Sequence, residues 1–226
     1  MRAQTVIVAS SMLSSALRPA NVRGFSRKRA TPAPFAPDQP HQIVFCSANQ
    51  EIYAQGEQST ALYQVEYGVV RLYRLLSDGR RQISAFHVAG EMFGFEADGQ
   101  HHFFAEAVGD AGIRVFRQAA NDGNWRQTLD AALAALVRAQ EHLLVVGRQN
   151  AAERVAAFLL DMAERQGSHG CIELAMSRTD IGDYLGLTIE TVSRTLSRFK
   201  ASGLVRLEGA RTVEVADARA LRALCA

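Results

Sequence analysis

Apolar residues come in short runs between residues 41 and 118. The runs are rich in Val, Ile, Tyr and Phe, and Gly or Asp separates them at intervals of roughly ten residues, the spacing of an antiparallel sandwich or barrel. The segment ALYQVEYGVVRLYRLLSDGRRQISAFHV shows this pattern most clearly. Within it, residues 77 to 80 predict a hairpin turn in which Gly79 takes a positive φ, and Gln82 to Phe86 predict the returning strand.

From Asn124 to about Val146 the pattern changes to a seven-residue repeat of apolar positions. The two columns of the repeat are Leu129, Leu136 and Leu143, and Ala132, Ala139 and Val146. Such a seam is typical of a coiled coil and predicts a dimerisation helix. A single amphipathic helix packed on its own domain would show much the same pattern. We favour the dimer, because the seam is narrow for a globular helix and polar residues flank it.

The segment after this repeat predicts a second long helix. Gly147 to Asn150 offer a hinge, and residues 151 to 165 then repeat apolar positions with helical spacing. The expected buried face comprises Val155, Phe158, Leu159 and Met162. We therefore divide the chain into residues 1–40, a β-rich domain at 41–122, the dimerisation helix at 123–147 and a C-terminal domain at 148–226.

Two short helices joined by a tight turn are predicted in the C-terminal domain. Ser177 is a suitable N-cap for the first helix, which runs to about Leu185. Gly186 follows as the left-handed residue that ends this helix. Thr188 then caps the second helix, which extends from Ile189 to about Ala201.

This pair of helices has the packing residues of a helix-turn-helix. Gly182 stands where the two helices cross, and a large side chain there would push them apart. The shared core is expected to contain Ile181, Leu185, Leu187, Val192 and Leu196. The unit is the one that places a second, recognition helix in the major groove of DNA.

The second helix presents a polar face once Val192, Leu196 and Phe199 are buried. The outward residues are Ile189, Glu190, Ser193, Arg194, Ser197 and Arg198. Arg can form a bidentate pair with guanine, Glu can accept from cytosine, and Ser can bond several base edges. Arg198 and Lys200 lie nearer the end of the helix and are better placed for phosphates.

On an isolated helix, an acid and an arginine four residues apart usually form a surface ion pair. Here the turn glycine, the crossing glycine and the packing residues occur in register with a wing, because SGLVRLEGARTVEV predicts two short strands around Gly209. The combination favours DNA recognition. The predicted DNA-binding residues are Ser177, Thr188, Glu190, Ser193, Arg194, Arg198 and Lys200.

Composition adds a basic N-terminal segment to this picture. The 226 residues are 48% hydrophobic and 21% charged, with a net charge of +2, and this length suits two domains. Residues 1–40 hold several basic side chains against one acid, Asp38, and are rich in Pro near their end, which predicts a flexible, solvated tail or one that touches DNA phosphates. No apolar run approaches the ~20 residues of a membrane-spanning helix, so no membrane passage is expected.

The cysteines and the first residues bear on the cellular compartment. Cys46, Cys171 and Cys225 are widely spaced and lack the CxxC pattern of a zinc site or a disulfide framework, so we expect a reducing cytoplasm. The start has a faint secretory look, but serines interrupt its apolar part and a basic stretch with proline follows. We therefore expect no signal peptide.

The segment MSRTDIGDYLGLTIETVSRTLSRFKASGLV resembles the Crp/Fnr superfamily of bacterial transcription regulators, in particular its Fnr and FixK branch. That branch carries Glu, two residues, Ser and Arg on its recognition helix, matched here by Glu190, Ser193 and Arg194; Ile189 stands where the cyclic-AMP receptor type has arginine. GEMFGFEADGQHHFFAEAV resembles the cyclic-nucleotide-binding jelly roll. The implied fold is α+β: a jelly roll, a long dimerisation helix and a C-terminal winged helix-turn-helix.

The resemblance also implies a function. A regulator of this type is a homodimeric activator that binds double-stranded DNA similar to TTGAT, four bases, ATCAA and works with RNA polymerase. It implies that Arg194 contacts the guanine, Glu190 the opposite cytosine and Ser193 a thymine. The FixK type switches on genes of microaerobic respiration and nitrogen fixation, and is commonly controlled through its own synthesis.

Two departures from the superfamily pattern concern cofactors. Cyclic-nucleotide binders hold an Arg-Ser pair where this chain has residues 101–104, HHFF, so we expect no cyclic AMP. Fnr holds an iron-sulfur cluster on cysteines, but no cysteine precedes Cys46, and Arg114 stands near the place of the last ligand. We expect no cluster and no other cofactor. The alternative is a sensor of the same superfamily that needs an effector or haem in its jelly roll.

Two further groupings could bind a metal or haem. His101 and His102 with Glu96 could hold a metal, but adjacent histidines on a strand point to opposite faces, which disfavours shared ligation. Cys46 with His87 could suggest haem, but two lone residues have no diagnostic spacing. We therefore assign no metal.

Cys171 could carry a redox signal, because it lies just before the apolar strand IELAM that leads into the helix-turn-helix. Oxidation there could disturb DNA binding if the thiol is exposed and reactive, and an inert structural thiol is the alternative. No nucleophile, base and orienting residue group together in the sequence, and we find no phosphate loop. The chain is not expected to be an enzyme.

Overall fold

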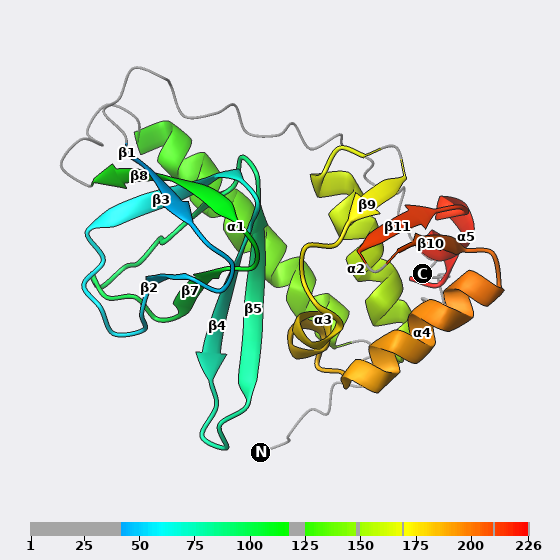
Figure 1. Ribbon diagram of the computed structural model, residues 1–226. Coiled ribbons are helices and arrows are strands. Elements are labelled where there is room, and N and C mark those ends of the chain that lie inside the picture. Colours follow the sequence, from blue (N-terminus) through cyan, green and yellow to red (C-terminus); the bar gives the residue numbers. More distant parts are fainter. Residues whose placement is uncertain (1–41, 118–124, 148–149, 169, 210, 226) are drawn as a thin grey trace, which may run out of the picture. The chain divides into compact units, whose positions relative to one another are not determined.

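Two four-stranded antiparallel sheets make up the first part of the described chain (Figure 1). Their strands are β1 (Gln42–Cys46), β2 (Glu51–Tyr53), β3 (Ala61–Tyr67), β4 (Val69–Leu75), β5 (Arg81–Val88), β6 (Met92–Phe93), β7 (Phe104–Ala107) and β8 (Ala111–Arg117). One sheet has the order β1-β8-β3-β6 and the other β2-β7-β4-β5. Side chains from both sheets meet in one apolar core that includes Val65, Val70, Phe93 and Ile113. This is the predicted jelly roll.

The computed structural model describes residues 42–117, 125–147, 150–168, 170–209 and 211–225. The predicted tail, residues 1–40, lies outside the described residues, as does part of the predicted hinge. All described residues belong to one compact unit.

The hairpin between β4 and β5 has the predicted turn. The Leu76 N–H donates to the Arg80 carbonyl at 2.8 Å, and Gly79 has a φ of +80°. A Cβ added at Gly79 would meet no atom within 4 Å, so the backbone conformation and not crowding favours glycine there. The turn therefore follows from local sequence alone.

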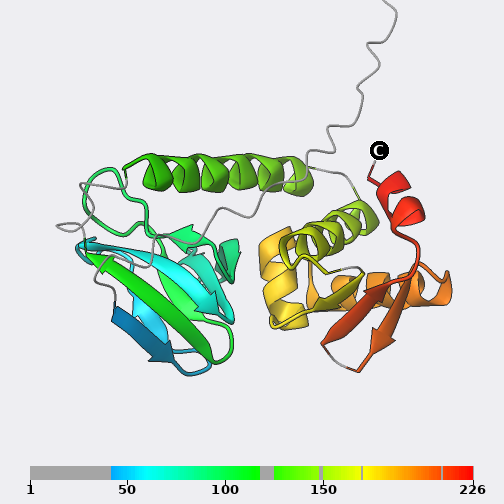
Figure 2. The ribbon, with the colours of Figure 1, turned by 90° about the horizontal axis from the view of Figure 1, so that it is seen from above.

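Helix α1 (Trp125–Val146) runs without interruption through the region of the seven-residue repeat (Figure 2). Of its described side chains, only Ala131 is fully buried, and its large apolar residues are mostly exposed. Neither α1 nor any other described helix combines the length and hydrophobicity that spanning a bilayer requires.

Helix α2 (Ala151–Arg165) begins at the cap Asn150, whose side chain accepts from the Glu153 N–H at 2.9 Å. Its apolar column faces inward, as predicted, and is almost completely buried: Val155, Phe158, Leu159 and Met162. Burial of such a column is the main source of stability for a helix of this length.

The C-terminal part is a winged helix-turn-helix (Figure 1). It comprises β9 (Cys171–Glu173), α3 (Arg178–Leu185), α4 (Ile189–Ala201), β10 (Val205–Glu208), β11 (Thr212–Val215) and α5 (Ala218–Ala223). The strands form one sheet in the order β10-β11-β9, so the predicted wing hairpin gains a third strand from the segment before α3. That strand is shorter than the predicted IELAM run, although the residues after it, Leu174 and Met176, are buried.

Candidate nucleic-acid interface

Ser177 begins α3 with a reciprocal cap. Its hydroxyl accepts from the Asp180 N–H at 3.1 Å, and the Asp180 carboxylate accepts from the Ser177 N–H at 3.0 Å. Serine followed by an acid three residues later is the sequence signature of this capping box. The predicted N-cap is confirmed, and a cap of this kind stabilises a helix by about 1 kcal/mol.

The turn between α3 and α4 depends on two glycines. Gly186 has a φ of +65° and its N–H donates to the Gly182 carbonyl, which ends α3 as predicted. A Cβ added at Gly182 would lie 2.6 Å from the Leu187 carbonyl oxygen. The backbones therefore touch where the helices cross, and the role predicted for Gly182 is confirmed.

Thr188 caps α4 through its side chain, which accepts from the Thr191 N–H at 3.3 Å. One face of the helix packs into the core shared with α2 and α3, and its buried residues are Val192, Thr195, Leu196 and Phe199. Thr195 is a buried polar residue that the sequence pattern did not single out. Because this face is buried, the opposite face of α4 points outward.

The outward face of α4 groups the predicted base-reading residues. Glu190, Ser193 and Arg194 are exposed and, with Ile189, line one shallow hollow. The pKa of the Glu190 carboxyl lies below its usual range, because it accepts hydrogen bonds from its own backbone N–H and from the Thr188 side chain, and Arg194 is nearby. The hollow therefore offers a carboxylate acceptor, a hydroxyl and a guanidinium donor side by side, the groups that read base edges.

The remaining predicted DNA-binding residues lie in the last turn of α4 and at the N-terminal caps of α3 and α4. Arg198 and Lys200 are exposed in the last turn of α4, and Ser177 and Thr188 cap the two helices. The Ser177 hydroxyl also donates to Asp180 at 2.7 Å, so it has a structural role of its own. On the wing, Arg206 pairs with Glu214 at 3.0 Å.

The two columns of the α1 repeat lie in different surroundings. Leu129, Leu136 and Leu143 are 47%, 53% and 71% exposed, and Leu133, Val137 and Leu144 add further exposed apolar surface. In the second column, Ala132 and Val146 are half-buried and Ala139 is exposed; Ala132, Ala139 and Leu136 of the first column line a cavity beside the jelly roll. All three large residues of the leucine column are therefore about half or more exposed, and exposed apolar side chains grouped in this way are typical of an interaction site.

Comparison with known proteins identifies the family. The cyclic nucleotide-binding domain model matches residues 43–121, and the Crp-like helix-turn-helix domain model matches residues 153–224. The chain is 50% identical over 194 residues to the nitrogen fixation regulation protein FixK of Rhizobium meliloti (strain 1021). The aligned residues cover 86% of this chain and 91% of that protein. The chain belongs to the Crp/Fnr family.

Within the Crp/Fnr family, the chain is 34% identical over 185 residues to the fumarate and nitrate reduction regulatory protein of Escherichia coli (strain K12), covering 76% of this chain and 74% of that one. The solved structure of FixK2 from Bradyrhizobium japonicum superposes with a TM-score of 0.79 at 40% identity, covering 83% of this chain and 98% of that chain. The predicted resemblance and fold are confirmed. The chain is a FixK-like transcription regulator with a helix-turn-helix, and not an enzyme.

In this Crp/Fnr protein, Cys171 is exposed on β9. It pairs in register with Glu214 of the wing strand β11. The other two cysteines are less accessible, and burial raises the pKa of the Cys46 thiol. Of the three, Cys171 is therefore the one whose thiol is open to solvent and adjacent to the wing, and its redox role stays a prediction.

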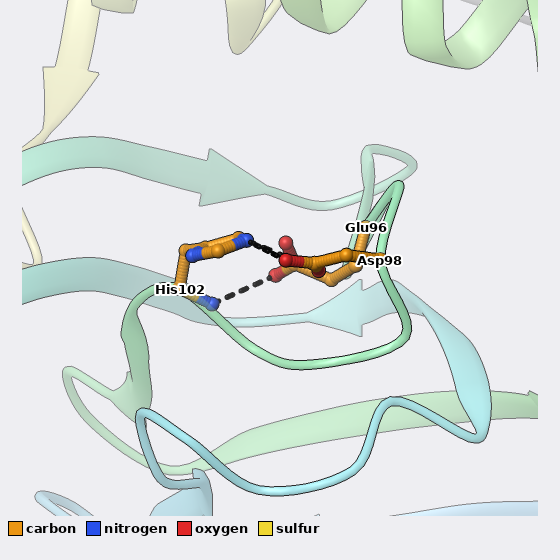
Figure 3. Close-up of side chains that lie close together, drawn as sticks. All are labelled: Glu96, Asp98 and His102. Carbon is orange, nitrogen blue, oxygen red and sulfur yellow. Dashed lines mark hydrogen bonds and ion pairs between the residues drawn. The ribbon is translucent and has the colours of Figure 1, made fainter.

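The loop before β7 groups Glu96, Asp98 and His102, whose ligand atoms lie within 4.8 Å of one another. Figure 3 shows His102 facing both carboxylates: its ring contacts Asp98 at 3.0 Å and its backbone N–H donates to Glu96 at 3.3 Å. The two histidines precede β7 instead of lying on a strand, and the buried His101 ring lies 3.3 Å from Glu96 Oε1 through Nδ1 and stacks on Tyr53 with centroids 3.6 Å apart. Asp98 and His102 are exposed and Glu96 is partly buried, and these side chains are linked by the contacts given above.

The two residues that could suggest haem come from different sheets of the jelly roll. Cys46 is on β1 and His87 on β5, in different sheets, and both are buried. Burial lowers the pKa of His87 to about 3, so its ring is neutral at physiological pH. Arg114 forms an ion pair with Glu66 at 2.5 Å.

A cavity of about 520 Å³ lies beside the jelly roll, α1 and α3. Arg74, Arg138 and Arg165 line it. The loop between β6 and β7, where cyclic-nucleotide binders have an arginine, contains none in this chain. The Arg74 Nε donates to the His102 carbonyl at 2.6 Å, and its guanidinium lies over the Phe103 ring at 4.7 Å. Sequence reasoning missed these arginines because they come from β4, α1 and α2, far from the loop along the chain.

Proposed function

We propose that this FixK-like regulator is a homodimeric activator that binds a palindrome similar to TTGAT, four bases, ATCAA through α4. The observation that carries the proposal is the grouping of Glu190, Ser193 and Arg194 in one hollow on the exposed face of a capped helix. A helix of this width fits the major groove, where each base pair has a distinct pattern of donors and acceptors.

Each reading residue has a role in this proposal. Arg194 donates to the O6 and N7 atoms of the guanine, and Glu190 accepts from the N4 amino group of the opposite cytosine. The low pKa of Glu190 supports this role, because an ionised carboxyl can only accept. Ser193 contacts a thymine, while Arg198 and Lys200 hold the phosphate backbone, and Ser177 and Thr188 cap the two helices beside it.

The homodimer of the proposal forms along α1. The exposed leucine column supports it, because three leucines that are about half or more exposed on one helix face would cost free energy in water. A second copy of α1 would cover them, with its own leucines placed symmetrically. Two recognition helices would then enter successive major grooves about 34 Å apart.

We further propose that the regulator acts in the cytoplasm with RNA polymerase on genes of microaerobic respiration and nitrogen fixation, and that it needs neither cyclic AMP nor an iron-sulfur cluster. The names of two relatives, nitrogen fixation regulation proteins, support the nitrogen-fixation part of this choice. The widely spaced cysteines support the absence of a cluster, since a cluster is usually held by several thiolates.

The test is binding-site selection from random DNA with the purified, dialysed protein. We expect a symmetric consensus with two half-sites and a four-base spacer to be enriched without any added effector. An asymmetric consensus, or no enrichment above random sequence, would overturn the proposal.

A second candidate is a regulator of the same family whose DNA binding requires an effector, and the cavity of about 520 Å³ favours it. The cavity is large enough for a small ligand. Full-strength binding to the selected palindrome by the dialysed protein would exclude this candidate, whereas binding that appears only with an added cell extract of small molecules would support it.

A further inference from the structure

Two arginines of the jelly roll contact the first helix of the helix-turn-helix. Arg71 on β4 donates through Nη1 to Asp180 Oδ1 at 3.2 Å. Arg81 on β5 donates through Nη2 to the same oxygen at 2.5 Å, and it donates to Asp183 Oδ2 through Nε at 3.0 Å and Nη2 at 2.9 Å. Four charged groups therefore join the β4-β5 hairpin to α3.

Asp180 uses its two oxygens for two different contacts. Its Oδ2 accepts from the Ser177 N–H at 3.0 Å and from the Ser177 hydroxyl at 2.7 Å, which closes the cap of α3. Its Oδ1 accepts from Arg71 and Arg81. One side chain thus begins α3 and also ties that helix to the jelly roll.

The centre of this contact is buried. The side chains of Arg71 and Asp180 are 7% and 6% exposed, so ion pairs and hydrogen bonds must offset the cost of burying both charges. On the jelly-roll side, Arg71 Nη2 also donates to Glu106 and, at 2.9 Å, to Asn49. Because those partners hold the guanidinium in place, it presents a donor of fixed direction to α3.

Apolar packing surrounds the charged groups. Tyr184 of α3 lies 5.1 Å from Phe86 of β5 and 5.8 Å from Phe158 of α2, measured between ring centroids. The Gln82 side chain donates to the Asp183 carbonyl at 2.6 Å. Apolar contact supplies attraction but little directional preference, whereas the ion pairs and hydrogen bonds select one orientation of α3.

The orientation of α3 is passed on to α4. The two helices touch backbone to backbone at Gly182, and the Leu187 N–H donates to the Gly182 carbonyl at 3.0 Å. Because these contacts couple α4 to α3, the residues that fix the orientation of α3 also fix the orientation of the α4 hollow that Arg194 lines.

We propose that Arg71 and Arg81 are positioning residues that fix the orientation of the helix-turn-helix without an effector and thereby set the half-site spacing that the dimer reads. This inference rests on the proposed function, because it requires two recognition helices on one palindrome. Two such helices fit a given spacer only if each is held at a fixed angle, since half-sites lie at a fixed distance along the duplex. A chain whose α3 can turn tolerates other spacers.

The experiment compares binding of the full-length protein to palindromes with spacers of three, four and five bases. Arg81 and Asp183 are about a quarter exposed, so exchanging their charges is less disruptive than changing the buried Arg71. Arg81→Asp places a third carboxylate beside Asp180 and Asp183, and we expect it to lower the preference for the four-base spacer at least about fivefold. The double variant Arg81→Asp with Asp183→Arg should recover much of that preference.

A matched control is Arg80→Asp. Arg80 is the neighbouring residue, but its side chain is 78% exposed and pairs with Asp78 inside the same turn. It should leave the spacer preference unchanged. If Arg81→Asp binds all three spacers with the same ratios as the parent chain, the positioning role is wrong.

A second measurement needs no DNA. Backbone amide exchange of residues 82–88 and 178–185 should be faster in Arg81→Asp than in the parent chain and in Arg80→Asp, because the contact between β5 and α3 opens more often. Unchanged exchange would overturn the inference. A parent chain without any spacer preference, but with faster exchange in Arg81→Asp alone, would overturn the palindrome of the proposed function and the setting of its spacing, and would support only the role of Arg81 in orienting α3.

Discussion

Arg165 of α2 and Glu91, in the turn between β5 and β6, form a two-point ion pair. Arg165 Nε lies 3.0 Å from Glu91 Oε1, and Nη2 lies 2.7 Å from Oε2. Both side chains are 10% exposed. Burial alone would raise the pKa of Glu91, but the charge and hydrogen bonds of Arg165 outweigh it, and the pKa lies below its usual range. The pair joins the jelly roll to the helix that follows α1.

Replacing Arg165 with leucine should destabilise the protein strongly. The variant leaves the Glu91 carboxylate buried without its main partner, and removing one member of a buried pair costs about 3–5 kcal/mol. Urea denaturation at pH 7 measures the change. The double variant Arg165→Leu with Glu91→Leu should recover a large part of the loss, because no buried charge is then left alone. A single variant as stable as the parent chain would contradict the importance of this pair.

Stability should fall as the pH is lowered from 7 to 5, chiefly because of His87. Its pKa is about 3 in the folded chain, because burial disfavours the charged ring, against 6.5 for an ordinary histidine. Between these values the unfolded chain binds a proton that the folded chain does not, so the free energy of unfolding decreases with falling pH, by about 2 kcal/mol at pH 5. Above the ordinary histidine pKa the ring is neutral in both the folded and the unfolded chain, so His87 no longer lowers the free energy of unfolding.

Urea denaturation at pH 7 and pH 5 checks this dependence, with His87→Phe as the comparison. The phenylalanine variant should show a smaller difference between the two pH values. The pKa of His142 is also lowered by burial, to about 4, but its ring is only partly shielded, so its effect on the free energy should be smaller. Equal pH dependence in His87→Phe and the parent chain would assign the effect to other groups.

Arg194→Ala should weaken binding to the selected palindrome and relax specificity at one symmetric base pair. A bidentate arginine-guanine contact discriminates by about 1–3 kcal/mol per half-site, and the alanine cannot replace it. Gel shifts with each of the four base pairs at that position measure the loss. Arg198→Ala is the contrast: a phosphate contact should weaken binding equally for all sequences and reduce the salt dependence. Unchanged specificity in Arg194→Ala would mean that another residue reads the guanine.

Leu143→Asp should convert the dimer to a monomer. Leu143 is 71% exposed in one chain, so the aspartate costs little within that chain but would be buried in the proposed helix pair. Sedimentation velocity at micromolar concentration measures the state of association, and Leu143→Met serves as the apolar control. If Leu143→Asp sediments like the parent chain, the dimer does not form through this column.

The elements that follow from neighbouring residues were predictable. Gly79 requires a positive φ, the Ser177 cap needs only an acid three residues on, and the burial of α4 follows from helical spacing. The family resemblance drew on the same short-range patterns. Each of these features depends on residues within one or two turns of chain, where periodicity and propensity carry the information.

The contacts between distant segments were not predictable in this way. Arg71 and Asp180 are 109 positions apart, and Arg165 and Glu91 are 74 apart. In the sequence each looks like an ordinary surface charge, and only the fold brings the partners together in a buried place. The arginines that line the cavity were not predictable for the same reason, because they come from three separate elements.

Gly182→Ala should destabilise the helix-turn-helix and weaken DNA binding, although alanine favours helices more than glycine does. The added methyl would lie 2.6 Å from the Leu187 carbonyl oxygen, which belongs to the backbone and cannot turn aside. Overpacking of this kind costs about 1–3 kcal/mol, more than the gain in helix propensity. Thermal unfolding and gel shifts measure both effects. A variant that melts higher than the parent chain and binds DNA equally well would show that α3 and α4 can separate without losing the recognition surface.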